Sequence, residues 1–125
     1  MFTKLFCQIQ SGGLFNTFHD YRGLMNINIP EQLTVIGDDL FSRCSSLSNV
    51  SIPNSVTSIG SSAFEECTSL ANVTIPSSVI SVGKRAFYGL ADNSTIYVET
   101  QAVADLLSGK YDSSKTTVVV DPSKF

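Results

Sequence analysis

Few residues in this chain have the chemistry of a catalytic site. The only histidine, His19, is followed by Asp20, and such a pair can serve as a general base and the group that orients it. A nucleophile would then have to lie on the same face of the fold, and the inward positions expected below for Cys44 and Cys67 remove these two thiols from that role. We therefore expect His19 to be an ordinary surface or capping residue, and we expect no enzyme.

Two pairs of consecutive acids, Asp38-Asp39 and Glu65-Glu66, offer carboxylates for acid–base chemistry or for Ca²⁺ binding. Both pairs are predicted to lie exposed on corners and short helices, where a solvated surface is the simpler interpretation. The chain also lacks a phosphate-binding loop and any metal-ligand spacing. We predict no metal site and no cofactor.

The three cysteines, Cys7, Cys44 and Cys67, form no CxxC motif, which argues against a zinc ribbon or a thioredoxin-like redox site. Cys44 and Cys67 hold the same column of the repeat described next, so they should lie on adjacent coils, where a disulfide is geometrically conceivable. Two buried, reduced thiols that act as small hydrophobic residues are the simpler prediction. Cys7 lies outside the clean repeats.

The positions of most of these residues are set by a sequence pattern that repeats every 23 residues. Val50 in one repeat, for example, corresponds to Val73 in the next. A period between 20 and 50 residues is typical of a solenoid, in which each unit contacts only its neighbours. The columns are Ile27/Val50/Val73/Ile96, Ile29/Ile52/Ile75/Val98, Pro30/Pro53/Pro76, Leu33/Val56/Val79, Ile36/Ile59/Val82, Gly37/Gly60/Gly83, Leu40/Ala63/Ala86, Phe41/Phe64/Phe87 and Cys44/Cys67/Leu90.

One side of each repeat is predicted to be extended. Residues 49–52 alternate polar and apolar side chains, as a half-buried strand does. Pro53 should end this strand, because proline has no backbone donor and fixes its own φ. Val56 and Ile59 then point inward from a second extended piece.

The other side of each repeat is predicted to turn back toward the next strand. Gly60 is expected at a sharp bend that needs a positive φ. Ala63, Phe64 and Cys67 have the spacing of a short helix or 3-10 turn with one face on the core. Stacking should place the phenylalanine of each repeat against the next one.

The repeat divides the chain into three parts. Residues 1–17 do not follow the register and are predicted to be an N-terminal cap or degenerate segment, with a cut from a longer array as the alternative. Residues 18–98 hold the repeats. Residues 99–125 are predicted to close the stack with a helix over 101–108, a strand over 116–120 and a loose tail from Asp121 to Phe125.

Composition narrows the classes of function. The chain has 125 residues, 42% of them hydrophobic and 15% charged, which is typical of one globular domain. Its net charge of −3 comes from scattered acids without a basic stripe, so nucleic acid is not an expected partner. We expect no membrane insertion, because no apolar run reaches about 18 residues. The first ten residues are too short and too polar for a signal peptide.

The pattern Leu-x-x-Val-x-Ile-Pro-x-x-Val-x-x-Ile-Gly-x-x-Ala-Phe-x-x-Cys, at residues 47–67, resembles the BspA-type, or Treponema pallidum-type, leucine-rich repeat. The resemblance covers Phe18 to about Val98, and the strand at residues 94–98 followed by a helix resembles the C-terminal closure common in that family. The implied fold is an α/β repeat solenoid. It would be a right-handed coil with a parallel β-strand ladder, short helical or 3-10 turns on the other side, and a C-terminal capping helix.

A ligand face, if present, should be the outward side of the strand ladder. Its residues are Asn26, Asn28, Asn49, Ser51, Asn72, Thr74, Thr95 and Tyr97. Only Tyr97 belongs to the residue types that dominate binding energy at interfaces, and small polar residues also form cross-strand ladders without any ligand. On the opposite edge, the equivalent positions are acidic in the first repeat, at Asp38-Asp39, and basic in the third, at Lys84-Arg85. Arg43 and Glu66 lie at equivalent positions on adjacent coils and are placed to form an ion pair.

The resemblance implies a non-catalytic interaction module of a bacterial surface or secreted protein that mediates adhesion to host matrix or to bacterial proteins. The alternative is a structural spacer or intracellular scaffold without a ligand of its own, in the cytoplasm. Exposed coil edges would also allow a weak homodimer if the N-terminal cap is poor.

Overall fold

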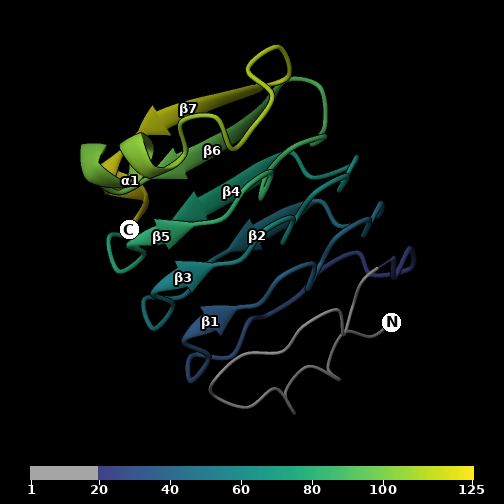
Figure 1. Cartoon of the computed structure of the whole chain (residues 1–125), viewed down its shortest axis with the longest axis horizontal. Coiled ribbons are helices and arrows are strands. Elements are labelled where there is room, and N and C mark those ends of the chain that lie inside the picture. The colour runs from purple at the N-terminus through teal and green to yellow at the C-terminus, as the bar shows by residue number, and fades with distance from the viewer. Residues whose placement is uncertain (1–19) are drawn as a thin grey trace.

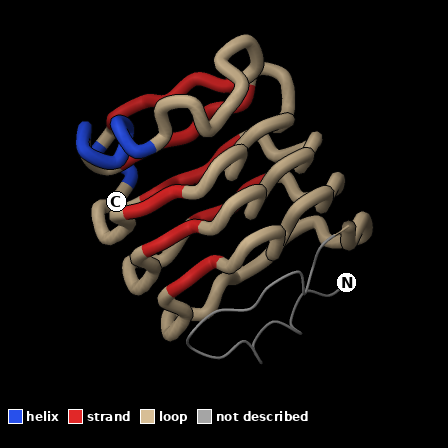
Figure 2. The backbone as a smooth tube through the Cα atoms, viewed as in Figure 1, coloured by secondary structure: helices blue, strands red, loops and turns tan. Residues whose placement is uncertain are grey.

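The computed structural model describes residues 20–125, which form a stack of coils joined by parallel strands (Figures 1 and 2). His19, Cys7 and the segment 1–17 lie outside the described residues, so the expectations for them stay predictions, as do the boundaries of the three parts. We name the coils 1 to 4 by the equivalent positions Asn26, Asn49, Asn72 and Thr95.

Two parallel ladders run along the stack. The longer ladder has the order β2 (Asn49–Ser51), β4 (Asn72–Ile75), β6 (Ser94–Val98) and β7 (Thr116–Val120). The shorter ladder has the order β1 (Val35–Ile36), β3 (Ser58–Ile59) and β5 (Ser81–Val82).

The strands pair one repeat apart. Asn49 lies opposite Asn72, and Asn72 lies opposite Thr95. Both predicted extended pieces exist in coils 2 and 3, whereas the first piece of coil 1 is a single bridge at Asn26. The strand predicted at residues 116–120 pairs with β6 and ends the longer ladder. The result is a parallel-strand solenoid, with coil 1 and coil 4 at opposite ends of the stack in Figure 1.

The inward columns form one continuous core. Phe41, Phe64 and Phe87 are fully buried, and their rings stack with centroid distances of 5.2 Å and 5.3 Å between successive coils. The small Ala63 and Ala86 beside them are also fully buried. The predicted stacking of the phenylalanine column is thus confirmed, and its physical reason is that no coil can bury a ring without its neighbours.

The glycine column recurs for a different reason from the one expected. Gly60 and Gly83 do not have positive φ angles; among the described glycines, Gly89 and Gly109 do. A Cβ on Gly60 would lie 2.6 Å from the backbone nitrogen of Asp38, and one on Gly83 would overlap the backbone nitrogen of Ser61. These positions require glycine because the backbone of the preceding coil passes too close for a side chain.

The predicted short helix or 3-10 turn over residues 63–67 was wrong. Ser62 and Glu66 have positive φ angles, which interrupt any helix, and the segment is a series of turns. The amides of Ser62, Phe64 and Glu66 donate to carbonyls of the next coil over 2.8–2.9 Å, whereas the intervening amides close local turns. Half of the donors that a helix would use are therefore committed to the neighbouring coil. We call the segments 37–44, 60–67 and 83–90 the turn face.

The chain after coil 4 begins with a short helix, α1 (Gln101–Leu106). The Thr100 hydroxyl accepts a hydrogen bond from the Val103 amide, which is the geometry of an N-cap. Val103 and Leu107 are buried in the core cluster, so the helix exists where it was predicted but stops two residues earlier. No helix of residues 20–125 is long and apolar enough to cross a membrane.

The C-terminal residues are ordered by local hydrogen bonds, contrary to the expected loose tail. The Asp121 amide donates to the Val98 carbonyl over 2.9 Å, which extends the pairing of β7 with β6. A 3-10 helix, η2 (Pro122–Lys124), follows. The Asp121 carboxylate caps it by accepting from the Ser123 amide and hydroxyl, and these bonds lower the pKa of Asp121.

Candidate ligand-binding face

The structure places all eight predicted ligand-face residues on one side of the longer ladder, and we call this side the strand face. These side chains are exposed in coils 1 and 2, whereas Thr74, Thr95 and Tyr97 are half-buried. The alternation arises because the neighbouring strand residues, such as Val50 and Val73, point into the core.

Hydrogen bonds join the outward side chains across the strands. Asn72 Nδ2 donates to Asn49 Oδ1 over 3.0 Å, and Thr74 Oγ1 donates to Ser51 Oγ over 3.1 Å. An asparagine amide has two donor hydrogens and an acceptor oxygen, so the ladder uses only part of its capacity. The face is therefore ordered, and it still offers donors and acceptors to a ligand.

Three adjoining hollows lie along this face. The first covers the asparagine column Asn26, Asn49 and Asn72. The second extends from Asn28 to the corner at Pro53, and the third continues from Pro53 to Lys124. Ser51 lines all three hollows, and we call them together the strand-face groove.

Tyr97 does not stand alone at the end of this face. The Lys124 ammonium group lies over its ring, 4.4 Å from the centroid, in the geometry of a cation–π contact. The one residue of the face whose type often dominates binding energy at interfaces is thus partly covered by η2. Lys124 and Phe125 instead line the third hollow.

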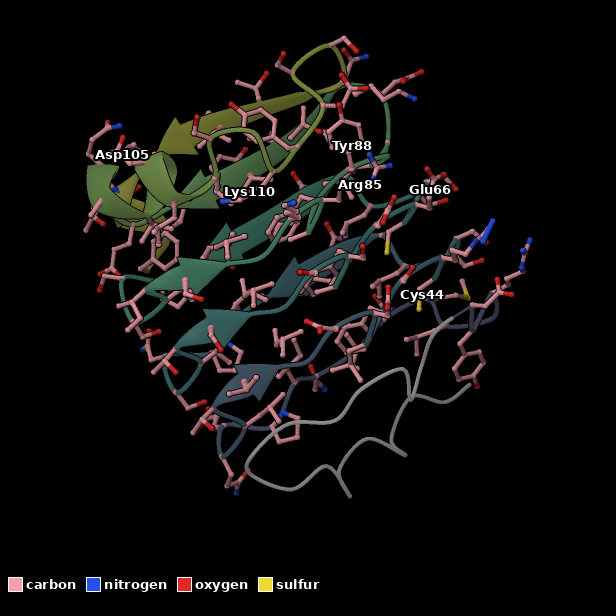
Figure 3. The ribbon with its side chains drawn as sticks, in the orientation of Figure 1. Cys44, Glu66, Arg85, Tyr88, Asp105 and Lys110 are labelled. Carbon is pink, nitrogen blue, oxygen red and sulfur yellow. The ribbon has the colours of Figure 1, made fainter. Side chains whose placement is uncertain are left out.

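The opposite side of the coils carries a different cluster. Arg85 pairs with Glu65, with 2.6 Å between Nη2 and Oε2, and its guanidinium group lies 4.5 Å from the centroid of the Tyr88 ring. Partial burial acts to raise the pKa of Glu65, but hydrogen bonds from Arg85 and Ser62 outweigh it and lower this pKa. Figure 3 shows Arg85 and Tyr88 together on the edge that also carries Glu66. No ion pair joins Arg43 to Glu66 in the described chain, so that predicted pair was wrong.

The two cysteines of the repeat are both buried and form no disulfide. The Cys67 thiol donates to the Phe41 carbonyl over 3.1 Å. Burial raises the pKa of Cys44 to about 11 and also raises that of Cys67. Because a thiolate is the reactive form, both groups are poor nucleophiles at neutral pH.

The acidic pairs have structural contacts. Asp38 Oδ1 accepts a hydrogen bond from the Ser61 amide over 2.9 Å, and Glu65 binds Arg85. Within residues 20–125, no group of three or more His, Cys, Asp or Glu side chains is placed to hold a metal ion. The position of Asp20 is described, but that of His19 is not, so the expectation that His19 has an ordinary role stays a prediction.

Sequence reasoning missed the part that η2 plays in the groove. A signal was available, because Asp121-Pro122-Ser123 has an N-cap residue followed by proline at the first helical position. Reading residues 121–125 as a tail ignored that start signal. The contact of Lys124 with Tyr97 had no signal, since it depends on how coil 4 and β7 pack.

The comparisons with known proteins agree with this geometry. Residues 15–117 match, in six copies, the family model described as the BspA type leucine-rich repeat region. A crystal structure of a leucine-rich repeat protein from Bacteroides ovatus superposes with a TM-score of 0.72 at 24% identity, covering 88% of this chain and 30% of that one. The pneumococcal vaccine antigen PcpA superposes with a TM-score of 0.59 at 17% identity, covering 90% of this chain and 41% of that one.

This chain therefore spans less than half the length of either solved structure. At these identities the likeness shows the fold. No curated protein matches the chain.

Proposed function

Because this chain belongs to the family of BspA-type leucine-rich repeats, we propose that it is a non-catalytic protein-interaction module whose partner binds the strand face. Leucine-rich repeat modules generally bind other proteins. The partner we propose is a host matrix protein or a bacterial protein, and the role is adhesion.

The observation that carries this proposal is the strand-face groove. It is a row of adjoining hollows over polar side chains, and Asn49 and Asn72 retain unused hydrogen-bonding capacity. On the turn face, by comparison, the charged side chains of Glu65 and Arg85 are already paired with each other. The groove thus offers hydrogen-bond donors and acceptors to a protein ligand.

The proposed location is the cell surface or the extracellular space. It is supported by the family and by the likeness of the fold to PcpA, which is a vaccine antigen. The alternative location is the cytoplasm.

The alternative function is a spacer or scaffold module. It is favoured by the same ladder, because Asn49 with Asn72 and Ser51 with Thr74 satisfy each other across the strands and need no ligand to be stable. A weak homodimer through a coil edge belongs to this alternative.

Two features of the fold belong to the proposal as well. We take the coil to be right-handed, and we take α1 to cap the stack. The capping role is supported by the burial of Val103 and Leu107, which would otherwise leave the end of the core open to water.

The test is binding of the purified domain to a panel of extracellular-matrix proteins, measured by surface plasmon resonance. The variant Asn49→Lys with Asn72→Lys fills the groove and adds two charges, and Tyr97→Ala removes the one large side chain of the face. A matched control is Ser61→Lys, which adds the same side chain on the turn face at the position that Lys84 occupies one coil later.

Saturable binding that is lost in the double asparagine variant and retained by Ser61→Lys would support the proposal. Equal loss in Ser61→Lys would place the binding surface elsewhere. No binding to any matrix protein would favour the spacer or scaffold function.

A further inference from the structure

We propose that the third hollow of the strand-face groove binds an extended peptide segment that carries one acidic and one basic side chain, the acid at Lys124 and the base at Glu31. This inference rests on the proposed function, because it specifies the ligand of the same face. It follows from three observations, namely a fixed wall, opposite charges at the two ends, and a floor of mixed polarity.

The wall is the C-terminal segment from Asp121 onward. Backbone hydrogen bonds join Asp121 to Val98, Lys124 to Asp121 and Phe125 to Pro122 over 2.9–3.2 Å. The Lys124 ammonium group is held over the Tyr97 ring. Such a wall loses little conformational entropy when a ligand binds, which favours affinity.

The two ends of the hollow have opposite charge. Lys124 contributes a cation at the coil 4 end, and Glu31 contributes an anion at the coil 1 end. Neither residue takes part in an ion pair of the described chain. Both charges are therefore available to a partner, and complementary charges at the rim of an interface select and orient that partner.

The floor between the two charges fits a polypeptide. Ser51 and Thr74 supply hydroxyl groups, whereas Pro53 and Phe125 supply apolar surface. Phe125 is 43% exposed, which leaves its ring accessible to a ligand side chain. A peptide presents both backbone hydrogen-bonding groups and apolar side chains, so it can use both parts of the floor.

The distance between the two charges determines how far apart the charged residues of the peptide should lie. Glu31 belongs to coil 1 and Tyr97, under Lys124, belongs to coil 4. Three strand spacings of about 4.8 Å give roughly 14 Å, and an extended peptide rises about 3.4 Å per residue. The acidic and basic residues of the peptide should therefore lie about four positions apart.

The experiment is a selection from a phage-displayed library of random 12-residue peptides on the whole domain, followed by fluorescence-polarisation titration of the enriched peptides. We expect enrichment of peptides with an acid and a base about four positions apart. Lys124→Glu should weaken such a peptide about tenfold, and replacement of the peptide's acid by lysine should restore binding to that variant. Lys115→Glu makes the same change of net charge away from the groove, and it should have little effect.

The outcomes separate the inference from the function on which it rests. Restoration by the charge-reversed peptide supports the inference. Equal weakening by Lys115→Glu, or a selection that yields no peptide dependent on Lys124 and Glu31, overturns it. Peptides that lose binding with Asn49→Lys and Asn72→Lys but do not respond to Lys124→Glu would support the proposed function and overturn this inference.

Discussion

The two sides of each coil use the same backbone in different ways. On the strand side, residues such as Val73 and Thr74 alternate inward and outward, and their backbone groups pair with strands above and below. On the turn side, every second amide bonds to the next coil, and two of the residues that donate these bonds, Ser62 and Glu66, adopt left-handed conformations. Both sides thus stack with the same period, although only one side is a regular ladder.

This difference shows at which columns of the repeat the stacking of coils restricts the size of the side chain. Inward columns must match in size because each side chain packs against its equivalent one coil away, as the three phenylalanines do. The left-handed column Asp20/Arg43/Glu66/Gly89 shares a backbone conformation but not a side-chain size. It accepts an acid, a base and a glycine, because side chains there point away from the core.

The largest expected change in stability tests whether the turn side depends on the hydrophobic core that it shares with the strand side. Phe64→Ala should lower the free energy of unfolding by about 3–5 kcal/mol, because it leaves a cavity between two stacked rings. Urea denaturation followed by circular dichroism measures this loss. The matched change Ile80→Ala, at a side chain that is 73% exposed, should cost under about 0.5 kcal/mol. A loss under about 1 kcal/mol for Phe64→Ala would refute the role of this column.

The second prediction compares two reasons why a position requires glycine, namely close contact with the neighbouring coil and a positive φ angle. Gly60→Ala should cost about 1–3 kcal/mol, since the new Cβ would meet the backbone of Asp38 in the preceding coil. Gly109→Ala places its Cβ in open space and should cost only about 1 kcal/mol from the positive φ of 78°. Thermal unfolding of both variants gives the comparison. A cost for Gly60→Ala below that of Gly109→Ala would mean that the coils can separate locally.

Substitution by glycine should change the free energy of unfolding by a smaller amount, and in opposite directions on the turn side and the strand side of the coil. Glu66→Gly should raise the free energy of unfolding by about 0.5–1 kcal/mol, because glycine adopts a φ of 62° without strain. Ser51→Gly, in β2, should lower it by a similar amount, because glycine weakens a strand. Chemical denaturation of the two variants in parallel checks the signs. Destabilisation by both would show that the Glu66 side chain contributes more than its backbone strain costs.

The smallest effect concerns the ion pair of the turn face. Glu65→Gln should lower stability at pH 7 by at most about 1 kcal/mol, since the Arg85 partner is half exposed to water. The folded pKa of Glu65 is lowered, so its contribution is present above the ordinary carboxyl range and is lost as the pH falls through the folded pKa. Thermal unfolding between pH 7 and pH 3 should show a shallower acid decline for the variant. Identical slopes would contradict the lowered pKa.

The columns that face inward could be predicted from the sequence because burial leaves a periodic pattern. Val50, Ile52 and Phe64 fall every 23 residues with their equivalents, and the structure buries all of them. The outward strand positions followed from the same alternation. What they bind could not be predicted, because asparagine and serine serve equally in ladders and in binding sites.

The turn side was harder to predict for a physical reason. Its spacing of apolar residues, Ala63, Phe64 and Cys67, is compatible with a helix, and the sequence does not reveal that alternate amides are taken by the next coil. Ser62 and Glu66 also adopt left-handed conformations although neither is glycine, so the sequence does not indicate these positions. In the same way, the need for Gly60 came from a neighbour 23 residues away and not from its own φ.

The hydrogen bonds of the turn face also have an electrical consequence. The peptide unit between Ser61 and Ser62 accepts from the Asp39 amide and donates to the Lys84 carbonyl, and the units before Phe64 and Glu66 are linked in the same direction. Peptide dipoles aligned in this way add, as they do in a helix, whereas those of strands alternate.

The turn face therefore carries a field along the stack, with its positive end toward coil 4. The side chains reinforce it, because Asp38-Asp39 lie in the first coil and Lys84-Arg85 in the third. A molecule with opposite charges at its two ends would be turned by this field to lie along the stack before it makes contact.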